Sequence, residues 1–143
     1  MMFYAAAADS SASAMPYDIV MQVTQGLELT AAPTGRMCDP WERCLKELES
    51  LFGLQDDWDG EGSAAPDPVN VRSAMRLLEL AYQSGNFPSQ PQAAPGGNGE
   101  VILVWREGDL YLEAEIAAPG KVEWMLAGPG RQTNHWVTEL PAA

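Results

Sequence analysis

Along the second half of the chain, hydrophobic and polar residues alternate with a period of two in the segments 110–116 and 121–127, and the segment 100–106 before them is a further predicted strand. Turn sequences at 107–109 and 118–120 separate these segments. The period of two, with one polar face, predicts an antiparallel β-meander with one side in water. Residues 135–140 are either a fourth strand or a tail. The positions predicted to face inward are Leu110, Leu112, Ala114, Ile116, Val122, Trp124 and Leu126.

Two helices are predicted before the sheet, because apolar residues recur there every three or four positions. Asp39 is the predicted N-cap of the first helix, Glu42 its capping-box acid, and Gly53 its stop. Asp67 caps the second helix, Pro68 opens it, and Gly85 ends it. The first apolar stripe contains Trp41, Cys44, Leu45, Leu48, Leu51 and Phe52. The second contains Val71, Ala74, Met75, Leu78, Ala81 and Tyr82.

The order of these elements predicts an α+β fold in which two antiparallel-type helices pack on one face of a three- to four-stranded antiparallel β-meander. Residues 38–127 form the predicted domain, with 140 as its alternative end. Residues 1–37 are a predicted flexible segment. Whether residues 17–30 form a short hairpin within it is not decided by the sequence. The proline- and glycine-rich stretch 86–99 is a predicted connector that is partly extended and mobile. Residues 128–143 are a tail or an edge strand.

The chain is strongly acidic, with 20 acidic and 8 basic residues and a formal net charge of -12. This charge disfavours direct binding to nucleic acid or to an anionic membrane surface, because both use Lys and Arg. It suits a basic protein partner, although charge alone also serves solubility. Cys38 and Cys44 are predicted to be reduced thiols, and His135 is the only histidine. The predicted location is the cytoplasm, with no membrane segment.

The loop around Trp58 is the most distinctive part of the chain. Asp57, Asp59 and Glu61 stand at alternate positions, as in a calcium-binding loop, but Pro68 occupies the place of the required bidentate glutamate. No metal site or cofactor is therefore predicted. Nothing in the loop indicates a cleft or a nucleophile beside a base, so enzymatic activity is left uncertain and disfavoured.

This loop has two interpretations. In the structural one, Trp58 folds beneath the helices into the core, Asp59 accepts backbone N–H groups, and Gly60 and Gly62 take positive φ. In the other, its exposed carboxylates form a recognition surface that continues onto an acidic face of the sheet. The candidate binding residues are Asp56, Asp57, Asp59, Glu61, Glu113, Glu115 and Glu123.

The motif Trp58-Asp59-Gly60-Glu61-Gly62 and the helix 71–78 that follows it resemble a family of small uncharacterised bacterial proteins with a W-D-G-x-G-A/S motif. The segments 101–105, 110–113 and 121–124 are similar to that family's strand motifs. Ser63 stands where Ala is common. The resemblance covers residues 40–127 and implies an accessory protein of a mobile or host-variable locus, with no established activity.

Three functional hypotheses follow. The first is a non-enzymatic acidic interaction module, antitoxin-like or regulatory, that binds a basic protein. The second is a phage- or defence-related inhibitor that mimics nucleic acid. The third is a hydrolase that uses Asp57, Asp59 or Glu61.

Overall fold

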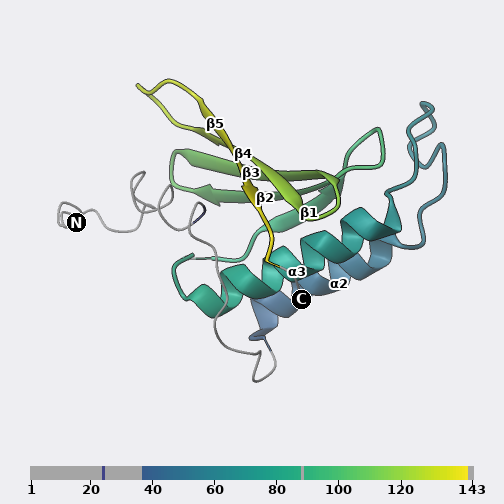
Figure 1. Ribbon diagram of the computed structural model, residues 1–143, viewed down its shortest axis with the longest axis horizontal. Coiled ribbons are helices and arrows are strands. Elements are labelled where there is room, and N and C mark those ends of the chain that lie inside the picture. The colour runs from purple at the N-terminus through teal and green to yellow at the C-terminus, as the bar shows by residue number, and fades with distance from the viewer. Residues whose placement is uncertain (1–23, 25–36, 88, 142–143) are drawn as a thin grey trace.

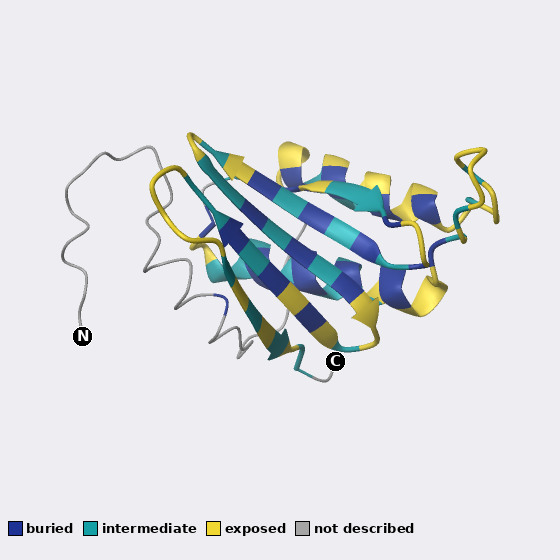
Figure 2. Cartoon of the chain, turned by 90° about the horizontal axis from the view of Figure 1, so that it is seen from above, coloured by how far each residue is buried: buried dark blue, intermediate teal, exposed yellow. Residues whose placement is uncertain are grey.

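The computed structural model describes residues 24, 37–87 and 89–141, and these residues form an α+β fold. A five-stranded antiparallel sheet lies over two helices that run side by side beneath one of its faces (Figure 1). We call the face toward the helices the inner face and the opposite one the outer face. No described element covers the outer face (Figure 2).

The strands follow one another in the sheet in chain order, so the sheet is a simple meander. The prediction of three to four strands was too low. The strands are β1 (Gln92–Pro95), β2 (Val101–Glu107), β3 (Leu110–Ala118), β4 (Lys121–Ala127) and β5 (Asn134–Glu139).

The extra strand, β1, lies inside the stretch predicted to be a mobile connector. It pairs with β2, with Gln92 opposite Val104 and Pro95 opposite Val101. Its sequence, Gln-Ala-Ala-Pro, has neither alternation nor β-branched residues, so only the neighbouring strand identifies it. At the other edge, β5 pairs with β4, which decides between the tail and edge-strand alternatives.

Helix α2 spans Asp39–Leu51 and helix α3 spans Pro68–Ser84. The predicted start of α3 is confirmed: the Asp67 side chain accepts a hydrogen bond from Val69 N at 2.9 Å. The predicted N-cap of α2 is wrong. Cys38 occupies that position and makes no side-chain capping bond, while Asp39 is already helical. The Asp39 carboxylate still lies in the first turn, where the helix dipole favours it.

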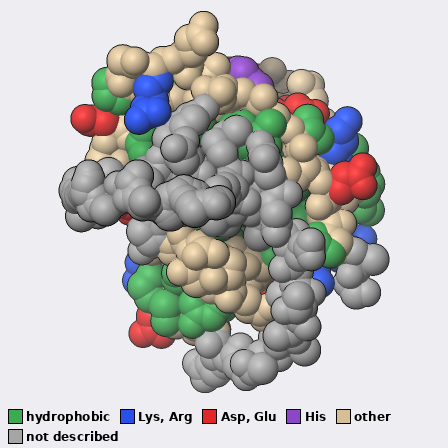
Figure 3. Space-filling model, turned by 60° about the vertical axis from the view of Figure 1, so that its left-hand side comes forward, with side chains coloured by type: hydrophobic (Ala, Val, Ile, Leu, Met, Phe, Trp, Pro, Cys, Tyr) green, Lys and Arg blue, Asp and Glu red, His purple; other side chains and the backbone are tan. Residues whose placement is uncertain are grey.

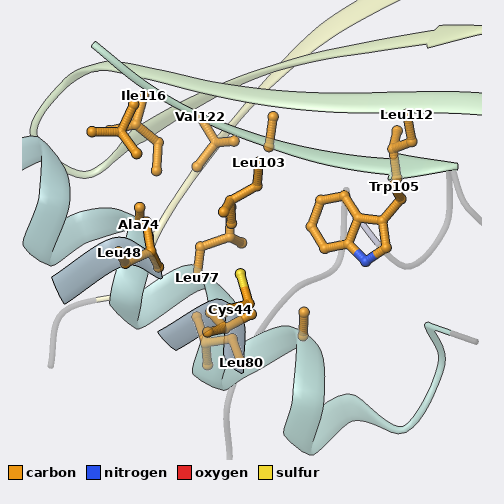
Figure 4. Packing of buried hydrophobic residues seen from close by; sticks show 14 of the residues in the cluster. Cys44, Leu48, Ala74, Leu77, Leu80, Leu103, Trp105, Leu112, Ile116 and Val122 are labelled. Atoms are coloured by element: carbon orange, nitrogen blue, oxygen red, sulfur yellow. The ribbon is translucent and has the colours of Figure 1, made fainter. Parts of the chain in front are cut away.

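The core lies between α3, α2 and the inner face (Figure 4). Helix α3 contacts β2 and β3, whereas α2 contacts α3 and flanks β1. Because α3 is held between α2 and the sheet, Leu77 and Leu80 are buried beside the predicted stripe. Phe52, predicted to extend the α2 stripe, is instead 44% exposed. Buried and exposed positions alternate along the strands, as the period of two requires (Figure 2).

A row of aromatic rings crosses the inner face. Trp105 stacks between Phe87 and Trp124, with centroid distances of 4.9 and 6.1 Å, and Trp124 stacks on Trp136 at 6.1 Å. Trp105 and Trp124 belong to strands on either side of β3, and the fully buried Ala114 is the β3 residue opposite Trp124. A small side chain at this position lets the two indole rings meet.

The hairpin left open at 17–30 falls outside the described residues, apart from Thr24. Thr24 has helical backbone and is fully buried. Its hydroxyl accepts a hydrogen bond from the Trp136 indole N–H at 2.9 Å. Among the residues that the structure describes, neither α2 nor α3 nor any other helix is long and apolar enough to cross a bilayer.

Candidate functional site

The loop between α2 and α3 has an unusual backbone. Gly60 and Gly62 have φ of 77° and 87°, as the structural interpretation predicted. Asp57 also has a positive φ, of 67°, which is uncommon for a residue other than glycine. Its N–H donates to the carbonyl of Ser63 at 2.6 Å, which closes the loop at its base. We call residues 56–63 the acidic loop.

Asp59 organises the centre of the acidic loop. One carboxylate oxygen accepts hydrogen bonds from Glu61 N at 2.9 Å and Ser63 N at 3.3 Å, and the other accepts from Ser63 Oγ at 2.5 Å. The Ser63 hydroxyl and these backbone N–H groups lower the pKa of Asp59. Asp59 is therefore ionised at neutral pH and acts as an acceptor for its own loop.

Two more carboxylates of the loop are used in the same way. Asp57 accepts a hydrogen bond from Gly62 N at 2.7 Å, and Asp56 accepts one from Ala65 N at 2.9 Å. These side chains are exposed, as predicted, but they satisfy backbone donors that would otherwise need water. These hydrogen bonds stabilise the conformation of the loop.

Trp58 does not enter the core, so this part of the structural interpretation was wrong. The residue is half-buried and lies outside the buried cluster and the side chains packed against it. Its indole N–H donates to the carbonyl of Ala64 at 2.9 Å. This hydrogen bond ties the indole ring to the backbone of the same loop. The loop turns away from the helix ends instead of folding beneath them, so Trp58 does not reach the core.

The chain just after the acidic loop is fastened to the β1–β2 turn, residues 96–100. Ala64 N donates to Gly97 O and Asp67 N donates to Gly99 O, each at 2.9 Å. The buried Asn70 side chain also donates to Gly99 O, at 3.1 Å. Two segments that are separate loops in the sequence are therefore hydrogen-bonded to each other. Because these hydrogen bonds join residues about 30 positions apart, no local sequence pattern predicts them.

The second group of predicted binding residues lies on the outer face of the sheet. Glu115 on β3 is directly opposite Glu123 on β4, and Glu113 lies two positions further along β3 on the same face. Glu100, at the start of β2, is a neighbour that the sequence analysis missed: it lies close enough to Glu115 to raise the pKa of that carboxyl group. We call Glu100, Glu113, Glu115 and Glu123 the sheet-face cluster.

Glu100 could have been found by counting back along β2. Positions 100, 102, 104 and 106 share one face by alternation, and Ile102 is opposite Glu115. Glu100 also holds the β1–β2 turn, because its Oε1 accepts from Asn98 N at 2.6 Å. A Cβ atom on Gly96 would meet the Glu100 side chain at 2.3 Å, so a larger residue there would displace the Glu100 side chain from its present position.

The other acids of the sheet-face cluster raise the pKa of Glu115. Partial burial raises the pKa of Glu115, and the hydrogen bond and negative charge of Glu100 raise it further. The charges of Glu123 and Glu113 act in the same direction. The cluster is therefore an electrostatically strained patch, unlike the acidic loop, where hydrogen bonding favours the ionised form.

The basic residues of the outer face lie apart from the cluster's centre. The Arg106 guanidinium is placed over the Tyr111 ring, 5.2 Å from its centroid, and Lys121 is opposite Glu139 on β5. Half-buried apolar side chains lie among the acids, including Val104 opposite Glu113 and Met125 opposite Glu113 on its other side. The outer face thus combines apolar area with concentrated negative charge.

The structure therefore separates the predicted binding residues into two groups that meet at one turn. Asp56, Asp57, Asp59 and Glu61 belong to the acidic loop, and Glu113, Glu115 and Glu123 to the sheet. The β1–β2 turn lies next to both groups: its carbonyls accept hydrogen bonds from Ala64 N and Asp67 N, and its last residue, Glu100, raises the pKa of Glu115.

Reactive side chains are few. Burial, followed by the charge of Glu47, raises the pKa of the Cys44 thiol to about 12, so it stays protonated at neutral pH. Cys38 is a free, exposed cysteine. The described residues contain no group of three His, Cys, Asp or Glu side chains placed to hold a metal ion. Comparisons of the chain with known protein families, curated proteins and solved structures found no match.

Proposed function

We propose that this protein is a small, non-enzymatic interaction module that binds a basic protein segment on the outer face of its sheet. The sheet-face cluster supplies the charge, and the apolar side chains between its acids supply the contact area. In this proposal the protein is the antitoxin-like or regulatory half of a pair encoded in a bacterial accessory or mobile locus. The resemblance carried by the W-D-G-x-G motif supports this setting.

The observation that carries the proposal is the sheet register, which places Glu115 directly opposite Glu123 and next to Glu113 on the same face. Like charges held together on a half-buried surface destabilise the free protein, and a bound Lys or Arg side chain removes that cost. The local net charge favours the same class of partner, because no basic side chain is opposite Glu113, Glu115 or Glu123 in the sheet register. A partner with alternating basic and apolar residues would match both features.

The acidic loop is a weaker candidate for binding or catalysis. Asp57 and Asp59 accept backbone hydrogen bonds from their own loop, and Asp56 accepts one from Ala65 just beyond it. A general acid needs a proton at neutral pH, and the lowered pKa of Asp59 removes it. These contacts support a structural role for the loop and count against a hydrolase centred on it.

The test compares two triple variants that lose the same charge. The first replaces Glu113, Glu115 and Glu123 with glutamine. The control carries Glu49→Gln, Glu61→Gln and Asp109→Asn, three exposed acids in other places. The probe is a fluorescent peptide of alternating Lys or Arg and apolar residues, titrated at low and at high salt.

The sheet-face variant should bind the peptide at least about tenfold more weakly at low salt, since each lost charge contact is worth roughly 0.5–1 kcal/mol. The control should bind like the unmodified protein, and high salt should weaken binding in all cases. Equal losses in both triple variants would show that only net charge matters. That result would refute the assignment to the outer face.

A further inference from the structure

The two edge strands of the sheet differ in how well they are protected from pairing with another chain. An exposed edge strand presents unpaired backbone groups that can pair with another chain, and proteins usually protect such edges. Strand β1 is protected: it is short, it ends at Pro95, and α2 flanks it. The Ala93 N–H, which a neighbouring strand could otherwise use, donates to Glu47 Oε1 of α2 at 3.1 Å.

Strand β5 lacks these protections. It is six residues long and contains neither proline nor lysine. Among the residues that the structure describes, no strand pairs with its outer edge. Its outer-face side chains are His135, Val137 and Glu139, and all three are exposed, with Val137 at 54%. The histidine is visible at the surface in Figure 3.

We propose that β5 pairs with β5 of a second copy of this chain, antiparallel, about a two-fold axis through Val137. In an antiparallel pair centred there, Val137 is opposite Val137 of the second copy. Residue 135 is then opposite residue 139, so His135 meets the second copy's Glu139, and the pair occurs twice by symmetry. An apolar contact is thus flanked by two His–Glu pairs, in which the imidazole N–H donates to the carboxylate.

The neighbouring register is less complementary. A shift of the axis to Trp136 places His135 opposite Val137 and Glu139 opposite Thr133, so both His–Glu pairs are lost. On the inner face, the chosen register places Trp136 opposite Thr138. Directly opposed side chains are the unit of sheet stabilisation, and complementary pairs therefore select the axis at Val137.

The pairing would join two five-stranded sheets into one. A two-fold axis perpendicular to the sheet keeps both outer faces on the same side, so the dimer presents two sheet-face clusters on one surface. The inference concerns the β5 edge alone and stands whether or not the outer face binds a basic partner.

Sedimentation equilibrium on the whole chain tests the proposal. The unmodified protein should approach twice the mass of one chain as its concentration rises. Val137→Lys places like charges opposite each other at the axis and should remain monomeric over the same range. The matched control is Val69→Lys, the same substitution at an exposed valine of α3, and it should dimerise like the unmodified protein.

A cross-linking experiment tests the register. With Cys38 replaced by serine, Val137→Cys should form a disulfide-linked dimer on oxidation, because the two Cβ atoms face each other. Ala117→Cys, at an exposed position of β3, should not cross-link efficiently. A monomeric unmodified protein, an equally dimeric Val137→Lys variant, or absence of the Val137→Cys cross-link would each overturn the proposal.

Discussion

Glu115→Gln should stabilise the free protein at neutral pH. Glu115 and Glu123 are directly opposed, so their side chains are roughly 5 Å apart. At that distance two like charges in water repel by about 0.8 kcal/mol, and salt near physiological strength reduces this to about 0.4 kcal/mol. Glu100 adds a second repulsion of similar size, and the glutamine amide can still donate to its carboxylate. The expected gain is about 0.5–1 kcal/mol in the free energy of unfolding.

The gain should depend on pH in a defined direction. The pKa of Glu115 is raised in the folded protein, so its ionisation destabilises the fold once the pH exceeds that raised value. Below the ordinary glutamate pKa of 4.5, Glu115 is protonated in both folded and unfolded chains, and this term disappears. The advantage of Glu115→Gln should therefore be full at pH 7 and should vanish as the pH falls below that value.

Urea unfolding followed by tryptophan fluorescence, at neutral and at acidic pH, provides the measurement. Glu61→Gln is the matched control, because Glu61 is exposed on the acidic loop and the substitution removes the same charge. Its effect should be close to zero. If Glu115→Gln lowers stability at neutral pH, or if its gain is the same at all pH values, the electrostatic strain assigned to the sheet-face cluster does not exist.

Four further substitutions test the fold and the loop. Asp67→Ala should cost about 1 kcal/mol in urea unfolding, because α3 loses its N-cap, whereas Asp39→Ala should cost clearly less, because Asp39 is not a cap. Ala114→Leu should cost about 1–3 kcal/mol by forcing apart Trp105 and Trp124, with a changed near-ultraviolet circular dichroism as its signature. Asp59→Ala should expose the acidic loop to limited proteolysis while far-ultraviolet circular dichroism stays unchanged; resistance equal to the unmodified protein would contradict the loop's hydrogen-bond network.

Features that depend on neighbours in the chain were predicted well. The period of two located β3 and β4, and the caps at Asp67 and Gly85 located the ends of α3. The positive φ of Gly60 and Gly62 followed from the residue type. In each case the decisive interaction spans a few residues, so the sequence pattern contains it.

Features that depend on distant partners were missed or misplaced. Strand β1 has no pattern of its own and exists because β2 pairs with it. Trp58 was expected in the core, since nothing local indicates that its loop would turn outward. Glu100 became part of the sheet-face cluster through the register of β2 against β3.

The sequence by itself determined the α+β class, the helix that Asp67 begins, the alternating strands and the strong negative charge. Only the tertiary structure decided what the acids do. It showed that Asp56, Asp57 and Asp59 accept hydrogen bonds from backbone N–H groups in and just after their own loop, while Glu115 lies near Glu100 and opposite Glu123. The reason is physical: a carboxylate's role depends on whether donors or other carboxylates lie within a few ångströms, and the folding of distant segments sets those neighbours.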